Sequence, residues 1–541
     1  MKQVLTIAIF ALAAFPLAAE EAEVPRTWLV ATTVPADLVF DARADLIELG
    51  DRSQTLRSRG ITKFRHVNGF AVKLTASEAR QLERSPLVRW VEPNLARKVS
   101  SSAPVVDSSL DSPAQIIPYG IAMVGAPESW KGSRGRNVKV GVIDTGIDRG
   151  HPDLAERYRG GYDFVNGDDD PQDDNGHGTH VAGTIAAVDN ELGVVGVAPE
   201  ADLYALKVLD DTGSGSVYTL ISAIEWAIDN DLDVVNMSLG SPQESALEKE
   251  VFERAEAAGI ICVAASGNAG ISKLDYPANY PTVVSVGAVD LAESIASFSQ
   301  RGANLDFVAP GVGVDSTIFH SFYGISTSDG KVLAAERMHY SPSGNVTGTL
   351  VDCGSGFKGQ CPPETTGNIA LIRRGETTFA DKVTTAKSAG AIAVVIYNHY
   401  LDTDPEGGVV LGTLGVPGPW PLTVGTSNSS GEHLRSLVDK TVTVSLNTRS
   451  DYGRKNGTSM ATPHVAGAIA VLLGMAPAAT SFEILESLRL TARDLGPAGW
   501  DSSYGNGRID VNQAARRLAP AAFEEPGQSR RRAARHPEAA D

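Results

Sequence analysis

Between residues 114 and 318, short apolar segments alternate with stretches whose apolar residues recur at helical spacing. Segments such as residues 138–144 and 260–264 are apolar at most positions and read as core strands. Strands that alternate with helices are typical of a parallel sheet flanked by helices. The pattern changes over residues 320–450 and returns over residues 452–515. We therefore predict an α/β fold that is interrupted by a separate segment.

A shorter region at residues 25–98 has a mixed pattern of its own. Residues 27–31 and 69–74 are strand-like, residues 76–84 are helix-like, and residues 88–94 read as a closing strand. This order predicts a small α/β domain before the main one.

Two further segments have no pattern of a packed element. Residues 99–113 are rich in Ser, Pro and Asp and are predicted to be a linker. Residues 520–541 contain Arg530, Arg531 and Arg532 without apolar periodicity, which predicts a disordered tail. Binding of the tail to an acidic partner is the alternative.

The first residues predict an export signal. Lys2 precedes an apolar run over residues 4–15, and small residues follow at Ala18 and Ala19. This order is that of a secretory signal, so we assign residues 1–19 to a signal peptide and expect a secreted protein. A buried N-terminal helix is the alternative. The run is too short for a membrane span, and we expect no membrane attachment in the mature form.

Composition limits the function classes. The chain has 541 residues, enough for about three or four domains. Its formal net charge of −18 argues against a nucleic-acid partner and is compatible with bound cations. The 3 cysteines exclude a disulfide-dense scaffold. Export permits disulfides, so we expect Cys353 and Cys361 to be bonded in their Gly- and Pro-rich stretch and Cys262 to be a free, buried thiol.

Three short stretches carry candidate chemistry. In residues 138–148 (VKVGVIDTGID) a strand ends at Asp144, at the edge where open α/β sheets have their sites. Alone, Asp144 could equally be a metal ligand or a turn cap. Residues 175–183 (NGHGTHVAG) place His177 between glycines where a helix begins. A metal site of His177 and His180 is a weak alternative, because no Glu accompanies them as in zinc hydrolases.

The third stretch, residues 456–467 (NGTSMATPHVAG), places Ser459 at the start of an apolar helix over residues 461–475. A helix N-terminus offers free N–H groups and a positive dipole end. Alone, Ser459 would be a plain helix cap. Asn268 follows a core strand, and its amide could donate a hydrogen bond to a developing oxyanion.

Together the stretches supply the parts of a nucleophilic triad. A serine hydroxyl needs an imidazole to take its proton, and the imidazolium needs a buried carboxylate. Their order, Asp, His, Ser, is that of subtilisin. With the Ser-Gly-Asn stretch between them, the motifs closely resemble the subtilisin family of serine endopeptidases over residues 114–318 and 452–515. The resemblance implies four catalytic residues: Asp144, His177, Ser459 and Asn268.

The resemblance also implies a substrate cleft. In this family an extended substrate pairs as a strand with two enzyme segments, and small residues leave room for its backbone. Outside the family pattern, each segment would be an ordinary turn. The residues implied are Gly213, Ser214, Gly215, Ser238, Leu239, Gly240, Ala265, Gly267 and Asp275.

The flanking regions resemble known partners of this fold. Residues 25–98, which close on VEPN at residues 91–94, resemble the inhibitor propeptide, an intramolecular inhibitor that assists folding. Residues 114–120 resemble a mature N-terminus, so autocleavage is expected within residues 99–113. The insert at residues 320–450 resembles a protease-associated domain, either a lid or docking module or a passive insertion.

The resemblance further implies structural Ca²⁺ and no organic cofactor. Oxygen ligands from loops suit this cation. The first site would use Gln115, Asp153, Asn190, Leu192 and Val194. The second would use Asp163, Asp168, Asp170 and Gln172, weakened because Asn166 replaces an acidic residue. A solvated acidic loop is the alternative for the second site.

Alignment over residues 274–281 (LDYPANYP) puts Asp275 at the floor of the primary specificity pocket. A carboxylate there would favour Lys or Arg before the scissile bond. If Asp275 instead turned into its own loop, the pocket would suit Phe or Leu.

We expect a monomeric, autoprocessed serine endopeptidase that acts on protein or peptide substrates. The alternative is a secreted inactive protease-fold binding protein that acts through its insert. The triad motifs are complete, which favours the enzyme.

Overall fold

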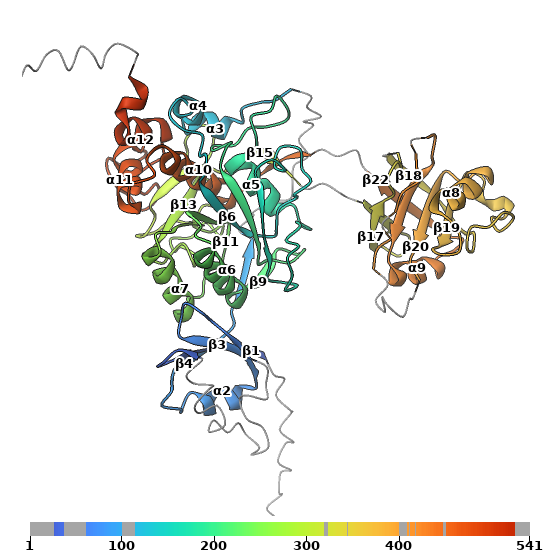
Figure 1. Ribbon diagram of the computed structural model, residues 1–541, viewed down its shortest axis with the longest axis horizontal. Coiled ribbons are helices and arrows are strands. Elements are labelled where there is room, and N and C mark those ends of the chain that lie inside the picture. Colours follow the sequence, from blue (N-terminus) through green and yellow to red (C-terminus); the bar gives the residue numbers. More distant parts are fainter. Residues whose placement is uncertain are drawn as a thin grey trace, which may run out of the picture. The chain divides into compact units, whose positions relative to one another are not determined.

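The computed structural model contains two compact units, each described by itself (Figure 1). Unit 1 comprises residues 1–106, 114–317 and 454–541, and unit 2 comprises residues 107–113 and 318–453. The predicted signal peptide and residues 100–113 of the predicted linker lie outside the described residues. The described residues are 26–36, 61–99, 114–318, 323–342, 344–399, 408–410, 412–416, 418–446 and 451–524.

A seven-stranded sheet forms the centre of unit 1, in the order β14-β13-β12-β10-β6-β8-β7. All its neighbouring strands are parallel, which confirms the predicted parallel sheet. Its strands are β6 (Lys139–Asp144), β7 (Tyr158–Asp163), β8 (Asp202–Lys207), β10 (Val234–Met237), β12 (Ile261–Ala265), β13 (Val283–Val289) and β14 (Phe307–Pro310).

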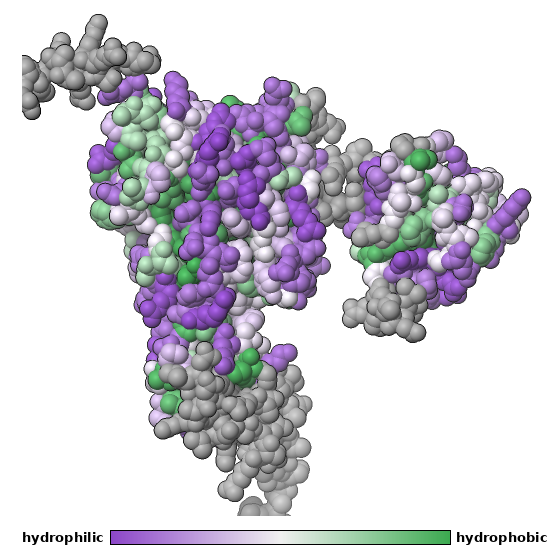
Figure 2. All heavy atoms as spheres, viewed as in Figure 1, coloured by the Kyte–Doolittle hydropathy of each residue, from purple (hydrophilic) through white to green (hydrophobic). Residues whose placement is uncertain are grey.

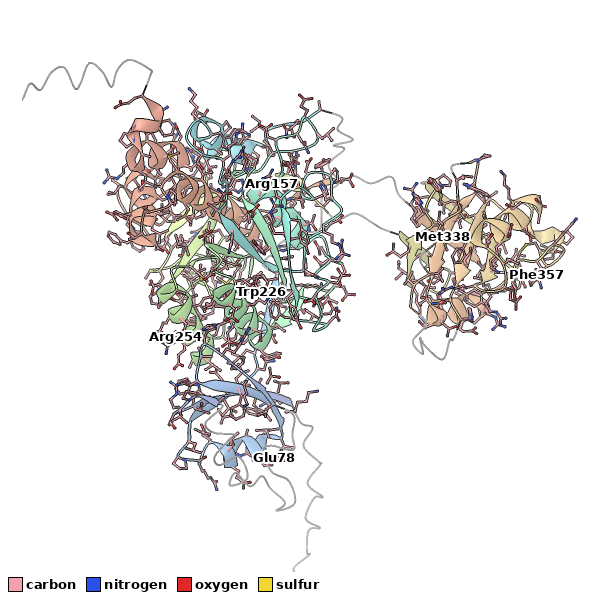
Figure 3. All side chains as sticks on the ribbon, viewed as in Figure 1. Glu78, Arg157, Trp226, Arg254, Met338 and Phe357 are labelled. Carbon is pink, nitrogen blue, oxygen red and sulfur yellow. A yellow bond between two sulfur atoms is a disulfide. The ribbon has the colours of Figure 1, made fainter. Side chains whose placement is uncertain are left out.

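Helices cover both faces of this sheet, as parallel strands require. One hydrophobic cluster joins α5 (His177–Ala186) and α10 (Thr458–Met475) to Val140 and Val142 of β6. The other cluster joins α6 (Val217–Asp229) and α7 (Ala246–Ala257) to Ile143. Figure 3 labels Trp226 on α6 and Arg254 in the last turn of α7. The remaining helices are α3 (Tyr119–Met123), α4 (Ala126–Ser129), α11 (Ser481–Thr491) and α12 (Val511–Leu518).

Helix α10 is long and apolar enough to cross a membrane, but 83% of it is buried inside the protein. Burial of this kind is expected of the central helix of a folded core. The outer surface of unit 1 seen in Figure 2 is largely hydrophilic, because the apolar residues of its helices face the sheet.

The prediction of a disordered tail over residues 520–541 is wrong for its first four residues. Residues Pro520–Phe523 form a 3-10 helix, η4, and Phe523 packs against the core. Arg516 lies 4.6 Å from the centre of the Phe523 ring. This aromatic anchor explains the order, and residues 525–541 lie outside the described residues.

The N-terminal part of unit 1 is the predicted small α/β domain. Its sheet has the order β2-β3-β1-β4, and helix α2 (Ala76–Leu82) begins with a capping box between Thr75 and Glu78 (Figure 3). Beyond β4, strand β5 (Ala96–Val99) lies between β9 (Ser214–Ser216) and β11 (Leu239–Gly240). The sheet strands are β1 (Arg26–Thr32), β2 (Ile61–Lys63), β3 (Gly69–Leu74) and β4 (Val88–Pro93).

Unit 2 is a closed barrel in the order β16-β17-β21-β20-β19-β18-β22. Cys353 and Cys361 form the predicted disulfide, whereas Cys262 of unit 1 is free and buried. The barrel strands are β16 (Tyr323–Thr327), β17 (Val332–Arg337), β18 (Gly344–Asp352), β19 (Ile369–Arg373), β20 (Ala393–Tyr397), β21 (Leu422–Thr426) and β22 (Thr441–Leu446). Its helical segments are η3 (Pro363–Thr365), α8 (Phe379–Ser388) and α9 (Asn428–Arg435).

Candidate active site

The predicted Asp144–His177 pair is formed and buried. Asp144 is the last residue of β6 and His177 the first of α5, and their side chains are 0% and 2% exposed. Nδ1 of His177 lies 2.8 Å from Oδ1 of Asp144. The same carboxylate oxygen accepts a hydrogen bond from Thr145 N at 2.8 Å. This arrangement fixes the imidazole with Nδ1 toward the carboxylate and Nε2 away from it.

A glycine is required beside this histidine. A Cβ at Gly178 would lie 2.1 Å from the carbonyl oxygen of Gly146 and 3.2 Å from Cβ of Asp144. Any side chain there would push β6 and α5 apart. The glycines in the histidine motif therefore have a packing reason.

Asp173, which sequence reasoning missed, holds the turn before His177. Its Oδ1 accepts hydrogen bonds from Thr145 Oγ1, Asn175 N and Gly176 N at 2.8, 2.9 and 2.9 Å. Its Oδ2 accepts from N and Oγ1 of Thr179 at 2.9 and 2.6 Å. An acidic residue shortly before a helix start was the available signal, since such residues satisfy unpaired N–H groups.

Two buried lysines, also missed, lie around the same turn. Nζ of Lys207 donates to the carbonyl oxygens of Thr145 and Leu209 at 2.8 and 3.0 Å. Nζ of Lys455 donates to Gly176 O at 3.1 Å. Burial lowers the pKa of Lys455, and Asp173 and Asp144 oppose that shift. Lys455 thus brings positive charge close to the buried Asp144 and Asp173, and Lys207 pairs with the half-exposed Asp174 at 2.6 Å.

Ser459 lies inside the first turn of α10, not before it. The helix begins at Thr458, three residues earlier than predicted, and Gly457 precedes it with φ 152°. Oγ of Ser459 donates to Ser238 O at 2.9 Å, and Oγ of Ser238 donates to Ser459 O at 2.8 Å. These bonds tie the predicted nucleophile to a predicted cleft residue.

Asn268 is oriented by the start of the same helix. Its Oδ1 accepts hydrogen bonds from N and Oγ1 of Thr458 at 2.9 and 3.0 Å. With Oδ1 directed at Thr458, the NH₂ end of the amide is directed elsewhere as a donor. Asn268 therefore lies close to the N–H groups at the start of α10.

The predicted cleft segments pair with a strand in this structure. In β5, Lys98 pairs with Ser214 of β9 and with Gly240 of β11, and Val99 pairs with Leu239. A Cβ at Gly215 would lie 2.2 Å from the backbone oxygen of Val208, so the segment needs glycine. Ala265, the last residue of β12, is fully buried and is not part of this strand pairing.

Asp275 lies beside Gly240 and Gly267, two residues of the predicted cleft. A Cβ at Gly267 would lie 2.7 Å from Oδ2 of Asp275, and one at Gly240 would lie 3.1 Å from its Cβ. Gln300 Nε2 donates to its Oδ1 at 3.2 Å. Burial raises the pKa of the Asp275 carboxyl, and the Gln300 hydrogen bond opposes the shift.

The structure gathers residues of the first predicted calcium site. Asp153 accepts hydrogen bonds from Asn190 Nδ2 at 3.0 Å and Val194 N at 3.1 Å. Gln115 Nε2 donates to the carbonyl oxygens of Val188 and Val194 at 2.8 and 3.4 Å. Leu192 is tied to the loop through its N–H, which donates to Asn190 Oδ1 at 3.0 Å. Val188 O is an oxygen that sequence reasoning missed.

The residues of the second predicted calcium site contact groups of the protein, and the site stays a prediction. Both carboxylate oxygens of Asp163 accept hydrogen bonds from its own loop, at Val165 and Asn166. Asp170 pairs with Arg149, and Gln172 Nε2 donates to Asp148 at 3.1 Å. Asp168 accepts from Asp170 N. Within the described residues, no group of three or more His, Cys, Asp or Glu is placed to hold a metal. Arg149, 21 residues before Asp170, thus pairs with one of the predicted ligands.

Comparisons with known proteins identify three regions. The model of the subtilase family matches residues 135–347 and 412–507, together more than half of the chain. The models of the protease-associated (PA) domain and of peptidase inhibitor I9 match residues 346–434 and 50–100. These matches confirm the three family resemblances, and the predicted domain bounds stay predictions.

Individual relatives match the catalytic region. Subtilisin E of Bacillus subtilis (strain 168) is 46% identical over 268 residues, which are 48% of this chain and 66% of that protein. Subtilisin of Bacillus pumilus is 52% identical over 217 residues, 39% of this chain and 78% of that protein. The chain thus spans just under two thirds of the first relative. A psychrophilic subtilisin-like protease from Pseudoalteromonas sp. AS-11 has 30% identity and a TM-score of 0.49, covering 76% of this chain and all of that one.

Proposed function

This chain belongs to the subtilase family, and from that premise we propose that it is a serine endopeptidase made as a precursor with its own inhibitor. The observation that supports the proposal is the buried Asp144–His177 pair, with its 2.8 Å separation, in the core that also holds the start of α10. We further propose export through the N-terminal segment, protein or peptide substrates, and a monomeric mature form without nucleic-acid or membrane partners.

Each residue has one role in the proposed mechanism. Oγ of Ser459 turns from Ser238 O toward His177, gives its proton to Nε2 and attacks the substrate carbonyl carbon. Asp144 holds the Nδ1 side of the ring and stabilises the imidazolium. The NH₂ of Asn268 and the N–H of Ser459 donate to the oxyanion.

The second half of the reaction reverses the proton path. His177 gives the proton to the leaving amine, which departs and leaves an acyl-enzyme on Ser459. Water attacks the ester with His177 as base, the acid product leaves, and the serine regains its proton.

A fluorophosphonate probe tests the proposal, because it labels only an activated serine. We expect stoichiometric labelling of the mature protein at Ser459 and turnover of casein. A correctly folded mature protein that stays unlabelled would indicate the alternative, an inactive protease fold used for binding.

For specificity we propose that Asp275 favours Lys or Arg before the scissile bond, supported by its place beside Gly240 and Gly267. Peptides that differ only in Arg, Phe or Leu at that position compare the wild type with Asp275→Asn. Arg should be preferred, and the substitution should remove the preference. Faster cleavage after Phe or Leu by the wild type would contradict this role.

We propose one structural calcium ion, held by oxygens of Asp153, Gln115 and Asn190 with the carbonyl groups of Leu192 and Val194. The donor set fits, since a buried carboxylate with amide and carbonyl oxygens suits a hard cation. Chelation should lower the melting temperature of the Ser459→Ala protein, and Asp153→Asn should abolish that response. An unchanged melting temperature on chelation would contradict the site.

A further inference from the structure

Arg97 is a fully buried arginine in a strand that leads to the active site. Its side chain and that of Glu248 are both 0% exposed. Nε of Arg97 donates to Oε1 of Glu248 at 2.9 Å, and NH2 donates to Oε2 at 2.5 Å. Two parallel bonds of this kind are the strongest form of arginine–carboxylate pairing.

The surrounding groups complete a site for a guanidinium. NH1 of Arg97 donates to Ser241 Oγ at 2.8 Å, and NH2 also donates to Gln243 O at 3.3 Å. The Tyr280 hydroxyl donates to Oε2 of Glu248 at 2.8 Å. Burial, with Glu248 nearby, raises the pKa of Tyr280, so the hydroxyl keeps the proton that it donates. All of these acceptors belong to the catalytic region.

The strand pairing shows how many residues separate the Arg97 position from the bond that Ser459 would attack. Arg97 pairs with Gly215, and Val99 pairs with Leu239 in an antiparallel ladder. The neighbour of Leu239 is Ser238, whose carbonyl oxygen accepts the hydrogen bond of Ser459 Oγ. A substrate bound in the same register therefore has its scissile bond one residue beyond the Val99 position. The Arg97 position is then the fourth residue before that bond.

We propose that Glu248 is a specificity residue which selects substrates with arginine four residues before the cleaved bond. This inference rests on the proposed endopeptidase function and names its substrate class. In the precursor, Arg97 fills the pocket as an internal ligand. When the propeptide leaves, Glu248 loses its cation, and a buried carboxylate without a counter-charge is unfavourable. An arginine of the substrate restores both hydrogen bonds, whereas leucine leaves the carboxylate unpaired.

Other propeptide contacts show that Arg97 is not needed merely to hold the propeptide in place. Glu92 caps α7, accepting hydrogen bonds from Ser245 Oγ, Ala246 N and Leu247 N at 2.6, 3.0 and 3.1 Å. Arg89 pairs with Glu250 at 2.6 Å. These contacts are made by other residues at the start of α7 and do not use the Glu248 carboxylate. Arg97, in contrast, lies on the strand that pairs with the predicted cleft segments β9 and β11, where a substrate is proposed to bind.

The test compares peptides that are identical except for Arg, Lys or Leu at the fourth residue before the bond. Wild-type mature enzyme should cleave the Arg peptide with at least about 30-fold higher kcat/KM than the Leu peptide, as expected for a buried, hydrogen-bonded charge pair. Lys should rank between them, because it cannot form two parallel bonds. Glu248→Gln should bring the three values together.

Glu253→Gln is the matched control, because it removes an exposed carboxylate from the same helix, α7. It should keep the preference. Glu248→Gln alone leaves Arg97 unpaired in the precursor, so the double variant Arg97→Gln with Glu248→Gln secures folding and maturation. Its mature form is Glu248→Gln enzyme.

The outcomes separate this inference from the proposed function. If fluorophosphonate labels the wild type but Leu is cleaved as fast as Arg, Glu248 does not select substrates and only this inference fails. A preference for Arg that persists in Glu248→Gln would also contradict only this inference. If no peptide is cleaved and Ser459 stays unlabelled, both proposals fail.

Discussion

The parallel strands of the two units differ in the residues that surround them, which are polar at the end of β6 in unit 1 and apolar inside the barrel of unit 2. In unit 1 the carboxyl end of β6 carries Asp144, and buried polar groups gather around it: Thr145, Asp173, His177 and Lys207. In unit 2 the parallel strands β19 and β20 have apolar interiors that include Ile369, Leu371 and Val395. After β20, Asn398 accepts a hydrogen bond from Arg374 at 3.1 Å and donates one to the carbonyl oxygen of Gly408 at 2.8 Å.

The contrast is that the polar groups at the sheet edge of unit 1 are buried and hydrogen-bonded to one another. Asp173 alone accepts five hydrogen bonds, four from residues 175–179 around His177 and one from Thr145. The barrel is stabilised instead by apolar packing and a disulfide. Substitutions in unit 1 should therefore change chemistry, and substitutions in unit 2 should change local stability.

The largest effect is expected from Ser459→Ala. Loss of Oγ removes the nucleophile, so turnover and fluorophosphonate labelling should disappear while the fold remains. The unprocessed precursor that retains residues 25–98 should accumulate, as seen by mass spectrometry. Ser222→Ala, which removes an α6 hydroxyl bonded to Tyr218 O, should still mature. Cleavage within residues 99–113 in purified Ser459→Ala protein would exclude autocatalysis.

Asn268→Leu should lower kcat by about 10² to 10³ and change KM little. The amide donates to charge that exists only in the transition state. Steady-state kinetics with one peptide substrate measures both constants. Equal changes in kcat and KM would instead assign Asn268 a structural role in holding the start of α10.

The free energy of unfolding of unit 1 should depend on pH through the buried His464. Burial lowers its pKa to about 4, with Nδ1 donating to Met460 O at 2.8 Å. The unfolded chain binds a proton near the usual pKa of about 6.5, and the folded chain does not. The free energy of unfolding should therefore fall by about 3 kcal/mol as pH drops from about 6.5 to 4.

Urea unfolding of the Ser459→Ala precursor at several pH values measures this slope without self-digestion. His464→Gln should be less stable at neutral pH, because its site is packed tightly against Gly120, but should lose part of the acid-side slope. An identical slope in both proteins would show that His464 does not carry it.

The smallest effect on chemistry is expected in the barrel. Replacing Cys353 and Cys361 together by serine should lower the stability of unit 2 by about 2 to 3 kcal/mol, because only a short loop is closed. Calorimetry should detect the change, and the labelling rate of Ser459 should remain that of the wild type. A slower labelling rate would show that the two units are coupled.

The sequence was informative where a residue type is required both by the backbone conformation and by the expected chemistry. The glycines around His177, the apolar strands and the family motifs predicted the sheet, the pair of Asp144 with His177, and the cleft segments. Lys455 was missed because its partner, the carbonyl oxygen of Gly176, is brought close only by folding. Asp173 was missed although its partners at residues 175–179 are close in the sequence. The ion pair of Arg149 with Asp170, a residue of the second predicted calcium site, was missed because the two residues are distant in the sequence.

The ends of the insertion lie on paired strands. Strand β15 (Val314–Thr317) leaves unit 1, strand β23 (Tyr452–Lys455) returns to it, and the two form a two-stranded sheet. Ile318 N donates to Asp451 O at 2.8 Å, so the ends are already close. Lengthening a loop between such fixed ends costs little, about 0.6 kcal/mol for each doubling. A whole domain can therefore stand in place of a short turn between β15 and β23 at a small cost in chain entropy.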